Sequence, residues 1–317
     1  MLRLAVVFIL ALAGLAQAQT YPSKPIKLVV GSGPGGPPDL IARVFAEQLG
    51  AQLGQPIIID NRVGAGGNIA GEVVAKAEPD GYTLMMALAT QFVANEFIFK
   101  SMPYDSKKDF VPISRVGDVV FMFGAHKDFG VGTLAEAIAK AKAAPGKINY
   151  GVGGSKNLPH FSAERLKQMA GIDLTHIAYR TAPQALQDFL RGDTMIYIGN
   201  PAEFAPHVAT GMVKPLAVTS PKRLSNWPDV PTVAETLPGY ATVSWMGLVA
   251  PRGTPQAIID RLAKESAEVK KNPALLKRYA DMNLEVVQDT PADFVRFINE
   301  DRAQWEKTIK ATGVEPE

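Results

Sequence analysis

Short apolar runs alternate with amphipathic segments along much of the chain. Residues 27–30 (KLVV) form one such run, and apolar side chains at positions 40, 41, 44, 45 and 49 then recur at helical spacing. The run predicts a buried strand, and the spacing predicts a helix that starts near residues 37–39 and ends near 50. A similar order of apolar run and helical pattern follows through residues 56–77. Strands that alternate with helices are typical of α/β proteins with mainly parallel sheets flanked by helices.

Two glycine-rich loops each join a predicted strand to a predicted helix. The first covers residues 31–38 (GSGPGGPP), and the second covers residues 151–155 (GVGGS), ahead of a predicted helix at 158–169. Each loop presents free backbone N–H groups beside the positive end of a helix dipole, which favours an anion. The alternative is that the glycines only make tight turns. Two such units in separate halves of the chain can face each other across a cleft.

Polar side chains follow two other predicted strands. Thr90 comes after the strand at 82–88, and Arg180 and Thr181 come after the strand at 176–179. Ligands of such sheets gather at the carboxyl ends of the strands. A guanidinium pairs bidentately with a carboxylate, which makes Arg180 a candidate ligand contact. The alternative for Arg180 is a surface position in a solvated loop.

Two aromatic residues have open interpretations. Phe92 and Trp245 either wall an apolar part of a ligand or belong to the core.

Residues 119–123 are predicted to form one strand, and the segment 102–112 before them is predicted to be a loop. The proline-rich stretch 227–238 is predicted to be an ordered loop.

Several helix starts are marked in the second half of the chain. Thr133 and Glu136 have the spacing of a capping box, and Thr254 and Thr290 each stand before a proline, as an N-cap residue stands before an N1 proline. Three helices are predicted to complete the chain. The buried face of the last one is marked by Phe294, Ile298, Trp305 and Ile309.

The first residues have the pattern of an export signal. Arg3, an apolar stretch from residue 4 to 15 and the triplet Ala16-Gln17-Ala18 predict a signal peptide over residues 1–18. No later run is long and apolar enough to span a bilayer, so we expect a soluble periplasmic protein. The chain has no cysteine, which excludes disulfides, thiolate metal sites and a cysteine nucleophile.

Charge and motifs argue against several other classes of protein. The 33 basic and 31 acidic residues leave no electrostatic footprint for nucleic acid. The histidines lack the spacing of metal ligands, so no metal site is expected. Neither glycine loop has the G-K-[ST] of a P-loop, and the sequence around Ser155 narrowly misses the G-x-S-x-G of a serine hydrolase. No nucleophile with its base can be assembled, which favours binding without catalysis and without a cofactor.

Longer stretches of the chain resemble a known family. They are, in order, YPSKPIKLVV with GPGGPPD, DNRVGAGGNIAGEVVAKAEPDGYTL, MPYDSKKDF, INYGVGGSKNLPHFSAE, and LAVTSPKRLSNWPDVPTVAE with APRGTP. In this order they resemble the extracytoplasmic solute receptors of the tripartite tricarboxylate transporter, the Bug (TctC-like) family. The resemblance runs from about residue 21 to 313.

The resemblance implies a two-lobed periplasmic binding protein of the type II-like class, with a ligand cleft between the lobes. One lobe would comprise residues 19–121 plus 221–317, and the other residues 122–220. The ligand would be a small organic carboxylate, such as a di- or tricarboxylate or an aromatic acid. The protein would act as a monomer, close its lobes on the ligand and deliver it to the membrane permease subunits. The alternatives are a periplasmic sensing adaptor for a sensor kinase and a secreted enzyme on a similar scaffold.

The candidate ligand-binding residues combine the family's loops with the polar positions above. They are Ser32, Gly33, Gly35, Gly36, Pro37, Asp39, Thr90, Gly153, Gly154, Ser155, Asn157, Arg180, Thr181 and Asn200.

The chain departs from the family pattern at positions that bear on the ligand. An aspartate is common just before Asn200, and here the residue is Gly199. If that acid serves a ligand's amino or hydroxyl group, its replacement argues against an amino-acid ligand. A glycine is common where Thr181 stands. A proline and an aromatic residue are common where Gly31 and Ser32 stand. The smaller side chains of Gly31 and Ser32 leave room for a larger ligand.

Replacement of Arg180 tests its assignment as a ligand contact. If its guanidinium pairs with a ligand carboxylate out of water, Arg180→Ala should weaken binding by about 2–3 kcal/mol, because a charged hydrogen bond is lost. Isothermal titration calorimetry measures this loss. An unchanged affinity would favour the alternative that Arg180 is a surface residue in a solvated loop.

Overall fold

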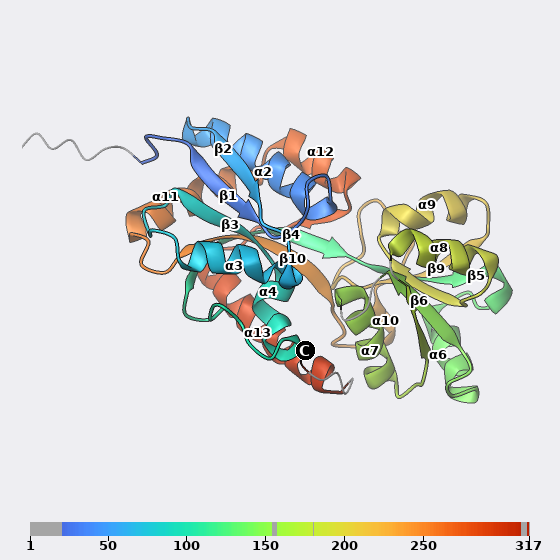
Figure 1. Ribbon diagram of the computed structural model, residues 1–317. Helices are drawn as coiled ribbons and strands as arrows, with labels where there is room; N and C mark the ends of the chain where they lie inside the picture. Colours follow the sequence, from blue (N-terminus) through green and yellow to red (C-terminus); the bar gives the residue numbers. More distant parts are fainter. Residues whose placement is uncertain (1–20, 154–156, 180, 312–315, 317) are drawn as a thin grey trace, which may run out of the picture.

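The computed structural model describes residues 21–153, 157–179, 181–311 and 316, and shows two lobes side by side (Figure 1). The first lobe is built on a six-stranded sheet of order β11-β4-β10-β3-β1-β2, and the second on a five-stranded sheet of order β7-β6-β8-β5-β9. Helices flank both sheets. The two-lobed α/β fold predicted from the sequence is confirmed.

The first lobe combines residues from both ends of the described chain. Its strands are β1 (Ile26–Val30), β2 (Ile57–Asn61), β3 (Thr83–Leu88), β4 (Phe110–Val120), β10 (Val243–Pro251) and β11 (Leu284–Val286). Its helices are α2 (Pro37–Leu53), α3 (Asn68–Ala75), α4 (Ala89–Val93), α5 (Asn95–Ile98), α11 (Gln256–Val269), α12 (Pro273–Asp281) and α13 (Pro291–Ala311), with the short 3-10 helix η2 (Ala65–Gly67).

The second lobe is formed by the middle of the chain. Its strands are β5 (Met122–His126), β6 (Asn149–Gly153), β7 (Thr175–Tyr179), β8 (Ile196–Gly199) and β9 (Val213–Val218). Its helices are α6 (Leu134–Ala143), α7 (Leu158–Ala170), α8 (Ala182–Arg191), α9 (Pro201–Ala209) and α10 (Val233–Thr236), with the 3-10 helix η3 (Lys127–Phe129). α10 contacts α6 of this lobe, although its residues belong to the segment after position 220. We keep residues 19–121 plus 221–317 and residues 122–220 as the proposed lobe boundaries, with α10 as a segment of the first range that packs on the second lobe.

Both sheets are mixed rather than mainly parallel. β1 runs parallel to β2 and β3, and β6 runs parallel to β7 and β8, as strand–helix–strand units require. β10 runs antiparallel to β3 and β4, and β5 runs antiparallel to β8 and β9. The antiparallel pairs arise because the chain leaves the first lobe along β4 and returns along β10.

The segment predicted as one strand at residues 119–123 is divided between the sheets. β4 ends at Val120 in the first sheet, and β5 begins at Met122 in the second. β4 also begins at Phe110, inside the segment predicted to be a loop. The hydrophobic pattern does not show where β4 ends and β5 begins, because the residues on both sides of the boundary are equally apolar.

Local capping signals predicted two helix starts correctly and one wrongly. The Thr133 hydroxyl accepts a hydrogen bond from the Glu136 N–H at 3.2 Å, and the Thr290 hydroxyl accepts one from the Asp293 N–H at 3.1 Å. Thr254 is not a cap, because its hydroxyl donates to the Pro251 carbonyl at 2.8 Å. α11 therefore begins one residue later than expected, after Pro255.

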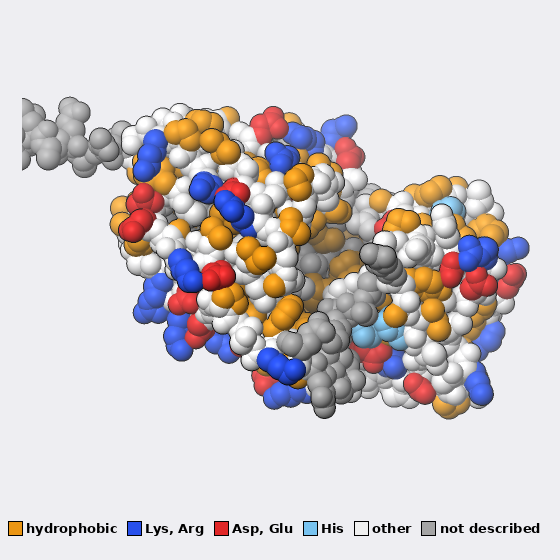
Figure 2. All heavy atoms as spheres, viewed as in Figure 1, with side chains coloured by type: hydrophobic (Ala, Val, Ile, Leu, Met, Phe, Trp, Pro, Cys, Tyr) orange, Lys and Arg blue, Asp and Glu red, His pale blue; other side chains and the backbone are white. Residues whose placement is uncertain are grey.

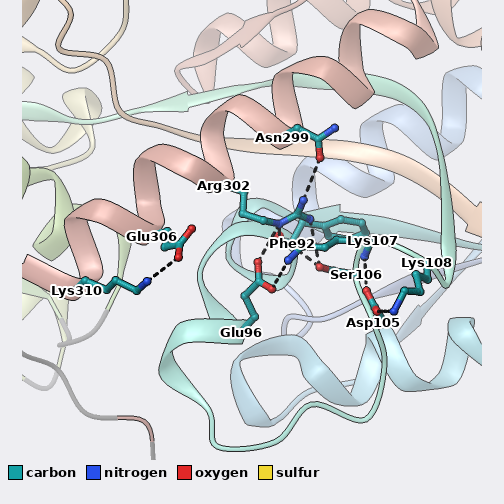
Figure 3. Close-up of polar contacts among 10 residues, drawn as sticks. All are labelled: Phe92, Glu96, Asp105, Ser106, Lys107, Lys108, Asn299, Arg302, Glu306 and Lys310. Carbon is teal, nitrogen blue, oxygen red and sulfur yellow. Dashed lines mark hydrogen bonds and ion pairs between the residues drawn. The ribbon is translucent and has the colours of Figure 1, made fainter.

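The last helix is anchored to the first lobe by a buried arginine (Figure 3). Arg302 Nε donates to the Phe92 carbonyl at 3.0 Å and forms an ion pair with Glu96 at 2.9 Å. A second guanidinium nitrogen donates to Ser106 Oγ at 3.2 Å. These bonds fix α13 against α4, α5 and the loop that carries Ser106. None of the helices in the described ranges is both long and apolar enough to cross a membrane.

The same helix places an acid against the centre of the first sheet. Asp301 is 8% exposed and accepts a hydrogen bond from Trp245 Nε1 at 2.8 Å. Burial raises the pKa of Asp301 to about 7, although the Trp245 bond and the Arg115 guanidinium lower it. Because the folded state holds this proton more tightly than the unfolded state, ionisation of Asp301 costs stability as the pH rises from about 4 through 7.

Asp301→Asn tests this cost, because an amide oxygen still accepts from Trp245 but cannot ionise. Between pH 5 and 8 the wild type should lose stability relative to the variant, by at most about 1.4 kcal/mol per pH unit. Chemical denaturation at several pH values measures the difference. Asp128→Asn, at a carboxylate that is 70% exposed, is the matched control. An equal pH slope in both variants would contradict the assignment to Asp301.

Candidate functional site

A cavity of about 290 Å³ lies between the two lobes. Figure 2 shows the surface hollowed between the lobes, with hydrophobic side chains inside the hollow. Its apolar walls include Ile41, Leu88, Val119, Phe121, Ile198 and Met246. Polar groups come from Thr90, Ser244, Tyr197, Asn200 and Glu203. The cavity therefore combines an apolar body with a few polar groups, as small-molecule sites do.

The two crossing strands form the floor of this cavity. Val119 and Phe121 lie on or just after β4, and Ser244 and Met246 lie on β10, so alternate residues of each segment face the cavity. The adjacent residues Asp118, Val120 and Val243 line a different space. A ligand in the cavity therefore touches the strands that connect the lobes.

Four helices begin at the cavity. Pro37 and Pro38 open α2, Pro159 lies in the first turn of α7, Ala182 opens α8, and Asn200 caps α9. Each helix directs its positive dipole end toward this region. No lysine or arginine is among the described residues that line the cavity. The positive potential that these residues supply thus comes from backbone.

Asp39 shapes the first glycine loop from within. Its buried carboxylate accepts hydrogen bonds from the Gly35 N–H, Arg43 Nε and Asn61 Nδ2, each at 2.8 Å. Asn61 Nδ2 also donates to the Ser32 carbonyl at 2.9 Å. Burial favours a higher pKa, but these hydrogen bonds lower the pKa of Asp39, so it stays ionised. Its carboxylate is already occupied, and it holds the loop in place.

The predicted site residues divide into three groups. Pro37, Thr90, Gly153 and Asn200 line the cavity. Ser32, Gly33, Gly35, Gly36, Asn157 and Thr181 lie in the loops and caps around it, and Asp39 lies in the first turn of α2; none of them lines the cavity. Gly154, Ser155 and Arg180 lie outside the described residues.

Asn157 and Thr181 act as helix caps in the second lobe. Asn157 Oδ1 accepts from the His160 N–H at 3.1 Å, and Asn157 Nδ2 donates to the Gly153 carbonyl at 2.7 Å. Thr181 Oγ1 accepts from the Gln184 N–H at 3.4 Å. Both side chains orient helix starts near the cavity.

Asn200 also links the two lobes. Its Oδ1 accepts from the Ala202 N–H at 2.9 Å, which caps α9. The same oxygen accepts from Asn283 Nδ2 at 3.1 Å, and Asn283 leads into β11 of the first sheet. This hydrogen bond joins the lobes at the edge of the cavity.

Sequence reasoning missed most of the apolar walls and Glu203. Phe92 and Trp245, the aromatic candidates, belong to the core instead, with exposures of 1% and 0% and ring centroids 5.8 Å apart. Val119 and Phe121 carry no distinguishing local signal. Only their alternation along a strand shared by two lobes identifies them, and that requires the fold.

A larger cavity of about 630 Å³ lies on the opposite face of the crossing strands. No helix begins among the described residues that line it. Two of its arginines are paired with carboxylates, Arg115 Nε donating to Asp118 Oδ1 at 2.7 Å and Arg223 Nε donating to Glu235 at 2.9 Å. We therefore take the smaller cavity, which helix N-termini surround, as the candidate ligand site.

Comparison with known proteins identifies the family. Residues 41–314 match the family model described as "Tripartite tricarboxylate transporter family receptor". A UPF0065 protein of Bordetella bronchiseptica is 35% identical over 301 residues, which cover 95% of this chain and 89% of that protein. Protein BugT of Bordetella pertussis is 33% identical over 309 residues, covering 96% and 95%.

Solved structures agree with this match. R. palustris Rpa4515 with adipate is 33% identical, has a TM-score of 0.77, and is matched over 94% of this chain and 100% of its own. MatC (Rpa3494) from Rhodopseudomonas palustris with bound malate is 29% identical, with a TM-score of 0.72 and coverage of 91% and 100%. The chain belongs to the tripartite tricarboxylate transporter receptor (TctC, or Bug) family of solute-binding receptors, a non-enzymatic class.

Proposed function

We propose that this protein is a periplasmic receptor that captures a small organic carboxylate between its lobes. The observation that carries the proposal is the convergence of four helix N-termini on an apolar cavity between two sheets. The positive dipole ends of these helices stabilise an anion without a dedicated cationic side chain. Two relatives hold carboxylates, adipate in one and malate in the other.

Capture would proceed by closure of the lobes. β4 and β10 form the floor of the cavity and the connection between the sheets, so a change at their ends rotates one lobe against the other. Closure would bring the starts of α7, α8 and α9 toward the start of α2. The same motion would remove the ligand from water, which strengthens each charge-assisted hydrogen bond.

The closed receptor would then deliver its ligand to the membrane permease of a tripartite tricarboxylate transporter. We propose that it acts as a monomer and that residues 1–18 direct it to the periplasm. Reconstitution with the permease tests delivery, and light scattering tests the monomer.

Thermal unfolding with a panel of carboxylates tests capture. A ligand at about 100 times its Kd should stabilise the receptor by about 2.7 kcal/mol, which raises the Tm by several degrees. Small-angle scattering should then show a smaller radius of gyration, because the lobes close. A panel of di- and tricarboxylates, hydroxy acids, amino acids and aromatic acids that gives no shift with ligand-free protein would contradict the proposal.

Gly153→Ala tests the contribution of the α8 N-terminus. An added Cβ would collide with the backbone N and Cα of Ala182, and so would force the start of α8 away from β6. The carboxylate affinity should fall by about tenfold or more, since the loss of one charge-assisted hydrogen bond has this size. Calorimetry below the Tm of the variant measures the affinity. In Gly132→Ala, the matched control, the nearest atom would lie 3.5 Å away, and equal losses in both variants would contradict this role.

A further inference from the structure

One wall of the ligand cavity carries a carboxylate. Glu203 is the third residue of α9 and lines the cavity. Its Oε2 accepts hydrogen bonds from the Tyr197 hydroxyl at 2.8 Å and from the Asn200 N–H at 3.2 Å. No hydrogen bond joins Oε1 to another residue within the described ranges. One carboxylate oxygen is thus fixed, and the other accepts from none of the residues that the structure describes.

Gly199 explains how this carboxylate reaches the end of β8. A Cβ at position 199 would collide with Glu203 Oε2 and with the ring of Tyr197. The volume over the backbone of Gly199 is therefore filled by these two side chains. Only glycine permits the arrangement without displacing one of them.

The charge of Glu203 has no cationic partner in the described lining of the cavity. It forms no ion pair with a described residue, and no lysine or arginine is among the described residues beside it. The N-terminus of α9 stabilises its negative charge. A ligand carboxylate placed against it would meet a like charge in a partly apolar cavity, where repulsion is poorly screened. A hydroxyl or ammonium group would instead donate to Oε1.

We infer that Glu203 determines specificity by accepting a hydrogen bond from a hydroxyl or ammonium group of the bound carboxylate. The preferred ligand is therefore a hydroxy acid or an amino acid rather than the matching acid without a donor. This inference rests on the proposed function, because the ligand's carboxylate still binds at the helix N-termini. It adds the chemistry of a second group on the ligand.

Glu203→Gln tests the inference, because glutamine keeps the shape and can preserve the cap of α9 while removing the charge. Calorimetry should compare matched acids: succinate with malate and aspartate, and adipate with 6-hydroxyhexanoate. The wild type should bind malate or aspartate, whichever binds better, about tenfold more tightly than succinate. It should likewise bind 6-hydroxyhexanoate about tenfold more tightly than adipate. In the variant this ratio should fall to about threefold or less, and succinate and adipate should bind more tightly than they bind the wild type.

The separate arms distinguish the outcomes. A preference for malate assigns a hydroxyl donor, and a preference for aspartate assigns an ammonium donor; both support the inference. A wild type that prefers succinate and adipate, or an unchanged ratio in Glu203→Gln, would overturn it while leaving carboxylate capture intact. A protein that binds no carboxylate at all would instead overturn the proposed function.

Two further variants separate charge from folding. Glu235→Gln changes the equivalent position of the capping box of α10, away from the cavity, and should leave the ligand ratios unchanged. Gly199→Ala should displace Glu203 and Tyr197 and lower the ratio as Glu203→Gln does. If Gly199→Ala fails to fold, Glu203→Gln still decides.

Discussion

The antiparallel pairing of β4 with β10 is the constraint on which the rest of the molecule depends. Nine residue pairs run from Val243 opposite Val120 to Pro251 opposite Phe110, through two register shifts. The pairing belongs to the antiparallel part of the first sheet, β3-β10-β4-β11, which continues the parallel strands β2, β1 and β3. It also carries the chain to and from the second lobe. The cavity floor, the order of the first sheet and the proposed route of lobe closure all follow from it.

Close packing keeps this pair of strands in place. A Cβ at Gly247 of β10 would collide with the ring of Phe294 on α13, and one at Gly117 of β4 would lie 2.8 Å from the Glu285 carbonyl on β11. Helix and neighbouring strand therefore approach the crossing strands more closely than any larger residue permits. Rigid packing on this side leaves the ends of β4 and β10 as the places where a hinge can bend.

Elements and caps that depend on neighbouring residues could be predicted from the sequence. Contacts between distant parts of the chain could not. The strand–glycine–helix order and the caps at Thr133 and Thr290 depend on residues within a few positions of one another, so the pattern predicts them. The walls at Val119 and Phe121 depend on which face of a shared strand meets the other lobe. Asp39 shows the same limit, since an acid beside a glycine loop suggests a ligand contact until Arg43 and Asn61 are seen to occupy it.

Gly199 shows that a position without an acidic side chain can still have a carboxylate beside it, supplied by another residue. Glycine at that position suggests that the cavity lacks an acid for a ligand's donor. In the structure Glu203, four residues later and one turn into α9, places its carboxylate over the Gly199 backbone. The helix start brings the two positions together, and the absence of a Cβ at one allows the other to fill the space. The specificity that we infer for this cavity therefore depends on Tyr197, Gly199 and Glu203 together, because any larger residue at position 199 would displace the other two side chains.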